Sequence, residues 1–204
     1  MNSQWGLLAE RYHLSQHMMQ QMIHYVTMLQ QAAQQYNLTA IVEESDIIEY
    51  HIADSLELGN CIDMQKVNML VDVGSGAGFP GLPLKIAYST CTVLLLEVLA
   101  KRRVFLQQVV DALLLASVMI DERDWRTFLR TSQEQVQVIC ARASLKPSEL
   151  LRMFQPSSPY RSAQLVYWAS EQWQPTVQEE KYIQKIHEYT VGNRTRKLVV
   201  FSAG

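Results

Sequence analysis

Cysteine is scarce in this chain of 204 residues, and the scarcity excludes two classes of protein. The three cysteines, Cys61, Cys91 and Cys140, are odd in number and form no Cys-x-x-Cys pair. This argues against a disulfide framework and against a structural zinc site, so we expect no metal. Unpaired cysteines suit a reducing compartment, and the first residues lack a basic leader followed by an apolar stretch. We therefore expect a cytoplasmic protein.

Long apolar runs and an excess of charge of one sign are also missing. No run approaches the roughly 20 apolar residues that span a bilayer, so we expect no membrane segment. The 18 basic and 20 acidic residues give a formal net charge of −2, which excludes polyanion binding through bulk charge. Basic residues still cluster at 101–103, 123–130 and 194–197, where they serve either a local partner or a solvated surface balanced by acids. The length suits one globular unit, which we expect to be a monomer.

Hydrophobic periodicity divides the chain into a helical part and an alternating part. Residues 3–36 contain no proline and carry apolar residues at helical spacing, and 47–58 predicts a further short helix. Later, short apolar runs alternate with longer helical periods, which predicts a parallel α/β sheet with helices on both faces. The expected strands cover residues 67–74, 91–98, 117–121, 136–141, 163–169 and 196–202. The expected helices between them cover residues 81–88, 100–116, 147–154 and 177–189. We expect N-terminal helices (1–60) to pack on a core (61–204) as one structural unit.

The stretch VDVGSGAGFPGLPLKI, residues 71–86, crowds four glycines and two prolines behind an apolar strand. The glycines at 74, 76 and 78 let the backbone turn tightly and approach a ligand closely, because no Cβ intervenes. The prolines at 80 and 83 are tolerated in the first turn of a helix, where the missing N–H would be unpaired anyway. The pattern predicts a ligand-binding turn at the carboxyl end of a strand, where open α/β sheets bind their ligands.

Two interpretations of the glycines point to different ligands. Gly76-x-Gly78-x-x-Gly81 matches the dinucleotide fingerprint, but that spacing alone is weak. The order acid-x-Gly-x-Gly-x-Gly, starting at Asp72, resembles the first motif of methyltransferases that use S-adenosylmethionine, in which this acid would face the methionine amine. Glu97 ends the next strand, where an acid can accept both ribose hydroxyls under either interpretation. A turn that binds no ligand is the third possibility.

Longer stretches of the sequence resemble one family. DVGSGAGFPGLPLKI followed by LLEVLAKRRVFLQQV resembles the bacterial small-subunit ribosomal RNA guanine-N7 methyltransferases, also called glucose-inhibited division protein B. The resemblance extends to YNLTAI and HIADSL upstream, and to ARASL and RKLVVF downstream. It implies a class I methyltransferase fold, Rossmann-like, with a mostly parallel seven-stranded sheet and an N-terminal helical extension. It also implies S-adenosylmethionine as cofactor, S-adenosylhomocysteine as product, and a guanine of 16S rRNA in the small ribosomal subunit as substrate.

The resemblance implies roles for individual residues. Arg142 matches a family arginine near the transferred methyl group, and Arg123 matches the Arg of a stretch whose next two residues usually meet the adenine; these two arginines are the expected catalytic residues. The expected cofactor-binding residues are Asp72, Gly74, Ser75, Gly76, Gly78, Phe79, Glu97, Asp124, Trp125 and Arg142. The expected RNA-binding residues are Arg123, Arg142, Arg194, Arg196 and Lys197.

The chain departs from the family pattern at several positions. Asp124 and Trp125 follow Arg123, where the family usually has Ala-Glu, and the fifth strand lacks the Lys that usually follows it. These departures keep a second hypothesis open, namely a cofactor-binding protein with a degenerate substrate site and little or no rRNA methylation. A nicotinamide-dependent oxidoreductase is a third hypothesis, which Asp72 and the family resemblance disfavour.

The sequence fits methyl transfer to guanine N7 through what it omits. N7 carries an in-plane lone pair and no proton, so its attack on a methyl group needs orientation and electrostatics but no general base. The chain lacks the Asn/Asp-Pro-Pro-aromatic stretch of amino-group methyltransferases and the Pro-Cys pair used against pyrimidines. Arg142 can hydrogen-bond a guanine edge or hold a phosphate, or it can form a structural ion pair. His51 and Asp54 lie one helical turn apart, and we expect a buried structural hydrogen bond between them.

Overall fold

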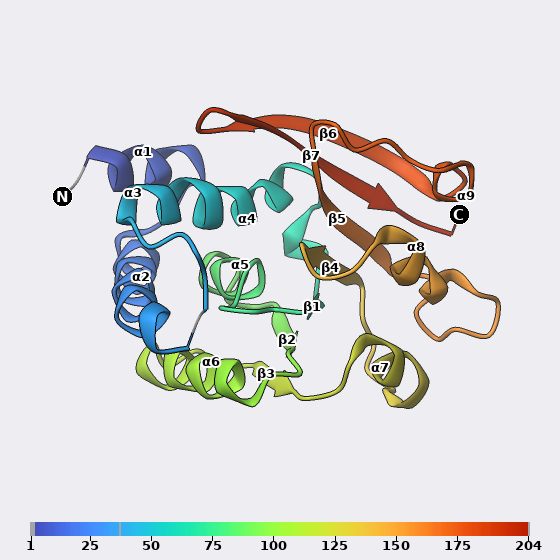
Figure 1. Ribbon diagram of the computed structural model, residues 1–204, viewed down its shortest axis with the longest axis horizontal. Helices are drawn as coiled ribbons and strands as arrows, with labels where there is room; N and C mark the ends of the chain where they lie inside the picture. Colours follow the sequence, from blue (N-terminus) through green and yellow to red (C-terminus); the bar gives the residue numbers. More distant parts are fainter. Residues whose placement is uncertain (1–2, 37, 204) are drawn as a thin grey trace.

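Figure 1 shows the computed structural model of the chain, which describes residues 3–36 and 38–203. Within these residues, seven strands form one sheet in the order β3-β2-β1-β4-β5-β7-β6. All neighbouring pairs from β3 to β5 are parallel, and β7 runs antiparallel to both β5 and β6. The strands are β1 (Met69–Val73), β2 (Thr92–Leu96), β3 (Val118–Asp121), β4 (Val138–Arg142), β5 (Gln164–Ser170), β6 (Ile183–Val191) and β7 (Arg194–Phe201).

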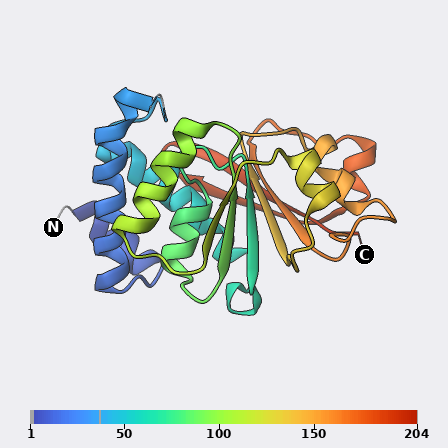
Figure 2. The ribbon, with the colours of Figure 1, turned by 90° about the horizontal axis from the view of Figure 1, so that it is seen from below.

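Helices cover both faces of this sheet, as Figure 2 shows. The larger helices are α1 (Ser3–Arg11), α2 (Gln16–Tyr36), α5 (Gly81–Ala87), α6 (Ala100–Ala112) and α7 (Trp125–Thr131). The short ones are α3 (Glu44–Ile47), the π-helical turn η1 (Ile48–Ala53), α4 (Asp54–Leu56), η2 (Glu57–Asn60), η3 (Met64–Lys66), α8 (Pro147–Leu150), η4 (Leu151–Phe154) and α9 (Val177–Glu180). Among the described residues, no helix combines the length and the apolar character needed to cross a membrane.

The central strands form because their apolar residues are buried on both faces of the sheet. Every residue of β1 is buried, which is typical of a central parallel strand covered by helices on both sides. Successive side chains point to opposite faces. Leu70 therefore packs with α2, α5 and α6, whereas Val71 packs with α7, α8 and η4. The predicted α/β class is confirmed.

The N-terminal helices pack directly on the core. Met22, Tyr25 and Leu29 form the apolar stripe of α2 and are fully buried against α5 and α6. The helical region 3–36 is divided between α1 and α2 at His13, whose φ of 53° is incompatible with a continuous helix. The predicted helix over 47–58 is confirmed as a continuous run of helical turns from α3 to η2.

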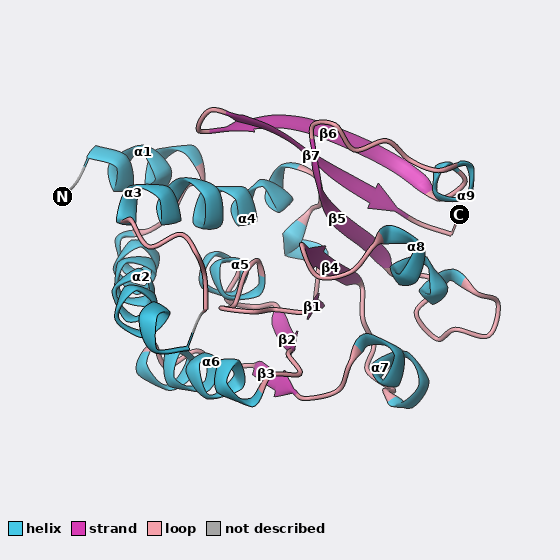
Figure 3. Ribbon diagram, viewed as in Figure 1, coloured by secondary structure: helices cyan, strands magenta, loops and turns pink. Residues whose placement is uncertain are grey.

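One predicted helix is wrong. Residues 177–180 are helical, but residues 183–191 form β6, which Figure 3 shows alongside β7. The capping box of Thr176 and Glu179 starts a helix, as the sequence indicates. The helix does not continue because β6 pairs with β7 across a turn at Gly192, whose φ is 58°. The seventh strand of the sheet thus comes from a segment whose local pattern predicts a helix. The sequence pattern also missed α7, which Asp124 caps by accepting a hydrogen bond from the Thr127 N–H.

The hydroxyl of Tyr25 ties α2 to the loop after β1. It donates a hydrogen bond of 2.6 Å to the carbonyl of Ala77, and both residues are buried. We expect Tyr25→Phe to lower the free energy of unfolding by about 1–3 kcal/mol, because it leaves a buried carbonyl without a partner. Denaturant unfolding measures this loss. Tyr88→Phe is the control, since the Tyr88 hydroxyl forms no hydrogen bond with the described residues. Equal stabilities of the two variants would contradict the prediction.

Candidate functional site

The glycine-rich loop lies between β1 and α5, at the carboxyl edge of the sheet. The strand order reverses here, between β1 and β4, which is where open α/β sheets bind ligands. Gly74, Gly76 and Gly78 have φ values of 71°, 60° and 106°, a region that side chains rarely adopt. A Cβ on Gly74 would also lie 2.6 Å from the Cβ of Ser144. The predicted tight turn is therefore confirmed, and glycine at 74 lets the loop after β4 approach closely.

Glu97 holds this loop from the end of β2. Its Oε2 accepts a 2.8 Å hydrogen bond from the Gly76 N–H, and its Oε1 accepts one of 2.9 Å from the Leu99 N–H. The carboxylate is only 3% exposed, and the guanidinium of Arg102 lies 3.6 Å from it. Glu97 thus joins the glycine loop to the start of α6 and keeps a negative charge between them.

Asp72 lies beneath the loop and is fully buried. Its Oδ2 accepts a 3.0 Å hydrogen bond from the Gly81 N–H, and the hydroxyl of Ser75 donates to its backbone carbonyl. Its Oδ1 has no hydrogen-bond partner among the described residues. Burial raises the pKa of Asp72 to about 7, while the bond from Gly81 acts in the opposite direction. A buried carboxyl oxygen without a partner suits a cationic or hydrogen-bond-donating ligand group.

Two cavities flank the loop. The Arg142 cavity, of about 290 Å³, lies between the loop, η1, the end of β4 and the start of β7. The Glu97 cavity, of about 440 Å³, lies between the ends of β1 and β2, the start of α7 and residues 143–145. Gly74, Arg102 and Ala143 line both. The two cavities therefore meet at the glycine loop.

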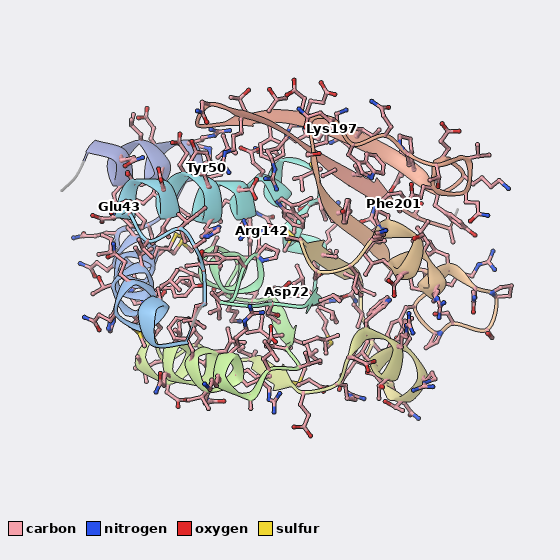
Figure 4. All side chains as sticks on the ribbon, viewed as in Figure 1. Glu43, Tyr50, Asp72, Arg142, Lys197 and Phe201 are labelled. Atoms are coloured by element: carbon pink, nitrogen blue, oxygen red, sulfur yellow. The ribbon has the colours of Figure 1, made fainter. Side chains whose placement is uncertain are left out.

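Arg142 lines the Arg142 cavity, and its guanidinium contacts several other parts of the cavity wall. Its Nη1 donates to Asp54 Oδ2 at 2.9 Å and to the Tyr50 carbonyl at 3.1 Å. The guanidinium also lies over the ring of Phe79, 5.3 Å from its centroid. In Figure 4, Arg142 lies between the helical segment that carries Tyr50 and the strand end that carries Asp72. Arg142 is thus positioned by η1 and α4, although it belongs to β4.

His51 contacts Arg142 and not Asp54, so the expected hydrogen bond between His51 and Asp54 is wrong. Arg142 Nη2 lies 3.0 Å from His51 Nδ1. Nδ1 also lies 3.1 Å from the Tyr50 carbonyl, and Nε2 lies 3.0 Å from the hydroxyl of Thr39. Burial and the charge of Arg142 lower the pKa of His51 to about 3, so the ring is neutral. The His51 ring also stacks on Phe79, with ring centroids 4.6 Å apart, and both side chains line the Arg142 cavity. We therefore interpret His51 as a structural residue that supports Arg142 and Phe79.

Asp54 joins three parts of the chain. Its side chain is 1% exposed, and its Oδ2 lies 2.9 Å from Arg142 and 3.7 Å from Arg196. Its Oδ1 accepts a hydrogen bond from the hydroxyl of Tyr189 in β6, and its carbonyl accepts one from the indole of Trp168 in β5. One buried carboxylate therefore balances two arginines and fastens α4 to the antiparallel side of the sheet.

The three residues of β7 that the sequence predicts to bind RNA lie on two different faces of the sheet. Arg194 and Arg196 line the Arg142 cavity, and the guanidinium of Arg194 lies 4.1 Å from the ring centroid of Tyr50. Lys197 is the next residue along the strand and points to the other face, where its Nζ lies 3.4 Å from the Trp173 carbonyl. The structure therefore does not bring Lys197 to the cavity with the other two, because successive residues of a strand alternate between faces.

Arg123 and its two neighbours line the Glu97 cavity, but each is already engaged by the protein. The guanidinium of Arg123 forms a two-pronged ion pair with Asp121, at the end of β3. The carboxylate of Asp124 caps α7, and the buried indole of Trp125 donates to a backbone carbonyl of α8. The structure therefore does not bring the two arginines predicted as catalytic, Arg123 and Arg142, into one cavity.

Arg102 is a residue of this site that the sequence pattern did not single out. It lies in the first turn of α6 and lines both cavities. Two features of the sequence could have identified it. Arg102 belongs to a basic cluster five residues after Glu97, and it lies at the start of a helix whose preceding strand ends at the site. Within the described ranges, no group of three or more His, Cys, Asp or Glu side chains is arranged to hold a metal ion.

Solved structures share the architecture. The chain superposes on the METTL16 MTase domain with a TM-score of 0.61 and 13% identity, covering 92% of this chain and 81% of that one. It superposes on a mutant of MtNAS in complex with S-adenosylmethionine with a TM-score of 0.58 and 15% identity, covering 100% and 79%. It superposes on a putative methyltransferase from Escherichia coli, yhhF, with a TM-score of 0.55 and 15% identity, covering 74% of this chain and 87% of that one. The fold is that of the class I S-adenosylmethionine-dependent methyltransferases, as predicted.

Curated relatives match more closely in sequence. The chain is 40% identical over 141 residues to a ribosomal RNA small subunit methyltransferase G from Chloroflexus aggregans, covering 68% of this chain and 57% of the relative. It is 31% identical over 182 residues to the protein of that name from Listeria monocytogenes, covering 88% and 76%. The chain thus spans little more than half the length of the first relative. Residues 18–196 match the family described as rRNA small subunit methyltransferase G, and the chain belongs to this family.

Proposed function

We propose that the protein transfers the methyl group of S-adenosylmethionine to N7 of a guanine in small-subunit ribosomal RNA. The observation that carries the proposal is the meeting of two cavities at Gly74, one lined by the buried acid Glu97 and one lined by Arg142. Membership of the methyltransferase family supports the reaction class. The products would be S-adenosylhomocysteine and N7-methylguanine in the RNA, formed in the cytoplasm.

The residues around the loop fit this cofactor. S-adenosylmethionine would supply an electrophilic methyl group on a sulfonium. Glu97 suits the ribose hydroxyls, and the exposed apolar side chains of Val98 and Leu99 suit the face of the adenine. The unpartnered Oδ1 of Asp72 suits the methionine amine, and Gly74, which lines both cavities, would lie beneath the cofactor where it passes from one to the other. We propose no metal in this reaction.

The target base would occupy the Arg142 cavity. Three of the five guanidinium N–H groups of Arg142 are engaged by Asp54, Tyr50 and His51, which leaves two donors for a ligand. The lone pair of N7 must stay free for attack, so these donors suit guanine O6 or a phosphate. No general base is required, and His51, whose pKa is lowered to about 3, is too weak a base to provide one. Arg194 and Arg196 would hold the RNA backbone at the rim.

A cofactor-binding protein with little or no rRNA methylation is the second candidate. Two observations favour it: Arg142 is 11% exposed and largely engaged, and Arg123 is paired with Asp121. The two candidates are separated by supplying labelled S-adenosylmethionine with 30S subunits or 16S rRNA and mapping N7-methylguanine with and without the gene. Transfer of label to guanine N7 supports the enzyme. Cofactor binding without any transfer to either substrate would favour the second candidate.

Arg142→Lys separates the geometry of the Arg142 fork from its charge. We expect turnover at saturating cofactor to fall on the order of 10²-fold, since misplacement of a reacting group costs about this much. The variant keeps a cation beside Asp54, whereas Arg142→Ala would leave the buried carboxylate only the more distant Arg196 as a cation and cost up to about 3–5 kcal/mol of stability. A melting curve checks the fold of each protein. A folded Arg142→Lys variant with full turnover would remove Arg142 from the account of the site.

The buried position of Asp72 predicts a pH-dependent affinity for the cofactor. Its folded pKa of about 7 lies above the unfolded value of about 3.9, so its contribution to stability falls as pH rises between these values. A cationic amine favours the carboxylate, so affinity for S-adenosylmethionine should rise about tenfold from roughly pH 5.5 to 7.5, below the usual pKa of α-amino groups. Calorimetry measures this rise. Asp72→Asn should bind more weakly and lose the rise; the same pH profile in both proteins would contradict the assignment.

A further inference from the structure

A third cavity lies at the other end of α7, away from the glycine loop. It measures about 620 Å³ and is formed by α7, η4 and the loop between η4 and β5. We call it the α7–η4 cavity. Its polar lining consists of Arg126, Arg130, Arg152, Ser132, Gln155, Ser157 and Ser158. Three guanidinium groups from two separate elements therefore converge on one hollow, although the chain as a whole carries a net charge of −2.

Two of these arginines have no partner that would explain their position. Arg130 and Arg152 are exposed, and neither forms a hydrogen bond or ion pair with residues 3–36 or 38–203. Arg126 is paired with Glu149 at 2.9 Å. The hydrogen bond from the Thr127 N–H lowers the pKa of Asp124, which is thereby engaged as the cap of α7, and the charge of Arg130 is only a minor cause. The lining thus carries an uncompensated positive charge.

The serines add hydroxyl donors to this charge. The Oγ of Ser158 accepts a 3.2 Å hydrogen bond from the Tyr160 N–H, which uses one of its acceptor sites and leaves its proton free to donate. Ser157 lies beside it on the same exposed loop. Guanidinium forks combined with hydroxyl donors match the oxygens of a phosphodiester, which accept several hydrogen bonds from planar donors.

We propose that the α7–η4 cavity binds a backbone phosphate of the RNA substrate, outside the reaction site. The inference rests on the proposed function for the identity of the RNA. The geometry supports it because α7 runs from the Glu97 cavity, which adjoins the Arg142 cavity at Gly74, to the new site: Trp125 at its start lines the Glu97 cavity, while Arg126 and Arg130 line the α7–η4 cavity. A helix of seven residues is about 10 Å long, which corresponds to roughly three phosphates along one strand of a duplex. RNA that reaches the reaction site along this side would therefore meet the second site within a few nucleotides.

The test removes the two unpaired charges together. Arg130→Gln with Arg152→Gln should weaken binding of 16S rRNA about tenfold or more at moderate salt, and should reduce the slope of log K against log salt by about 0.7, the value for one lost phosphate contact on a single strand. Turnover at saturating RNA and affinity for S-adenosylhomocysteine should be unchanged. Arg130→Lys with Arg152→Lys should retain most of the affinity and the slope, because the charges remain.

Lys66→Gln with Lys185→Gln is the matched control, since it removes two exposed charges that line none of the three cavities. An equal loss in the control pair, or an unchanged salt slope in the arginine pair, would overturn the proposal. Poly-glutamate that competes as well as RNA, with the same dependence on the two arginines, would assign the cavity to an acidic protein segment and also overturn it. Methyl transfer by the wild-type protein is scored separately. Transfer with an unchanged slope rejects only the α7–η4 site, and an altered slope without transfer rejects only the catalytic function.

Discussion

The buried carboxylate of Asp54 is the interaction on which the rest of the site depends. An isolated charge in the protein interior is costly, so Asp54 is stable there only with Arg142, Arg196 and Tyr189 around it. Each partner comes from a different strand: β4, β7 or β6. The carboxylate thereby fixes the distance between the N-terminal helices and the sheet. The helical extension is therefore part of the site's wall, and Arg142 would be misplaced without it.

The glycine-rich loop could be predicted from the sequence because backbone conformation there is a local property. Gly74, Gly76 and Gly78 alternate at positions where only glycine adopts a positive φ at little cost, and no other part of the chain alters that requirement. The strands β1 and β2 could also be predicted from the sequence, because a strand buried on both faces is a continuous apolar run. Fold class and the place of the site followed from these two patterns.

Side chains that depend on distant partners could not be predicted in the same way. The segment 183–191 carries a helical pattern, yet it forms β6 because β7 offers a complete ladder of hydrogen bonds. The spacing of His51 and Asp54 indicates a contact, but both turn toward Arg142, which is about 90 residues later in the chain. Whether Lys197 and Arg102 reach the site depends on the direction in which each side chain points. Lys197 points away from the Arg142 cavity, because successive residues of a strand alternate between faces. Arg102 points into that cavity from a basic cluster whose members the sequence alone does not distinguish.

The π-helical turn η1 determines how the residues around Arg142 are oriented, because it contains one residue more than an α-helical turn would. A π turn contains one residue more than the α-helical path, and one residue in a helix corresponds to a rotation of about 100°. The turn ends at Ala53, directly before Asp54, and it contains Tyr50 and His51. Both the carbonyl of Tyr50 and the ring of His51 meet Arg142 within this turn. An ordinary α-helix of the same composition, one residue shorter, would present these groups in a different direction from Asp54. The length of this segment is therefore as much a determinant of the site as the chemistry of its side chains.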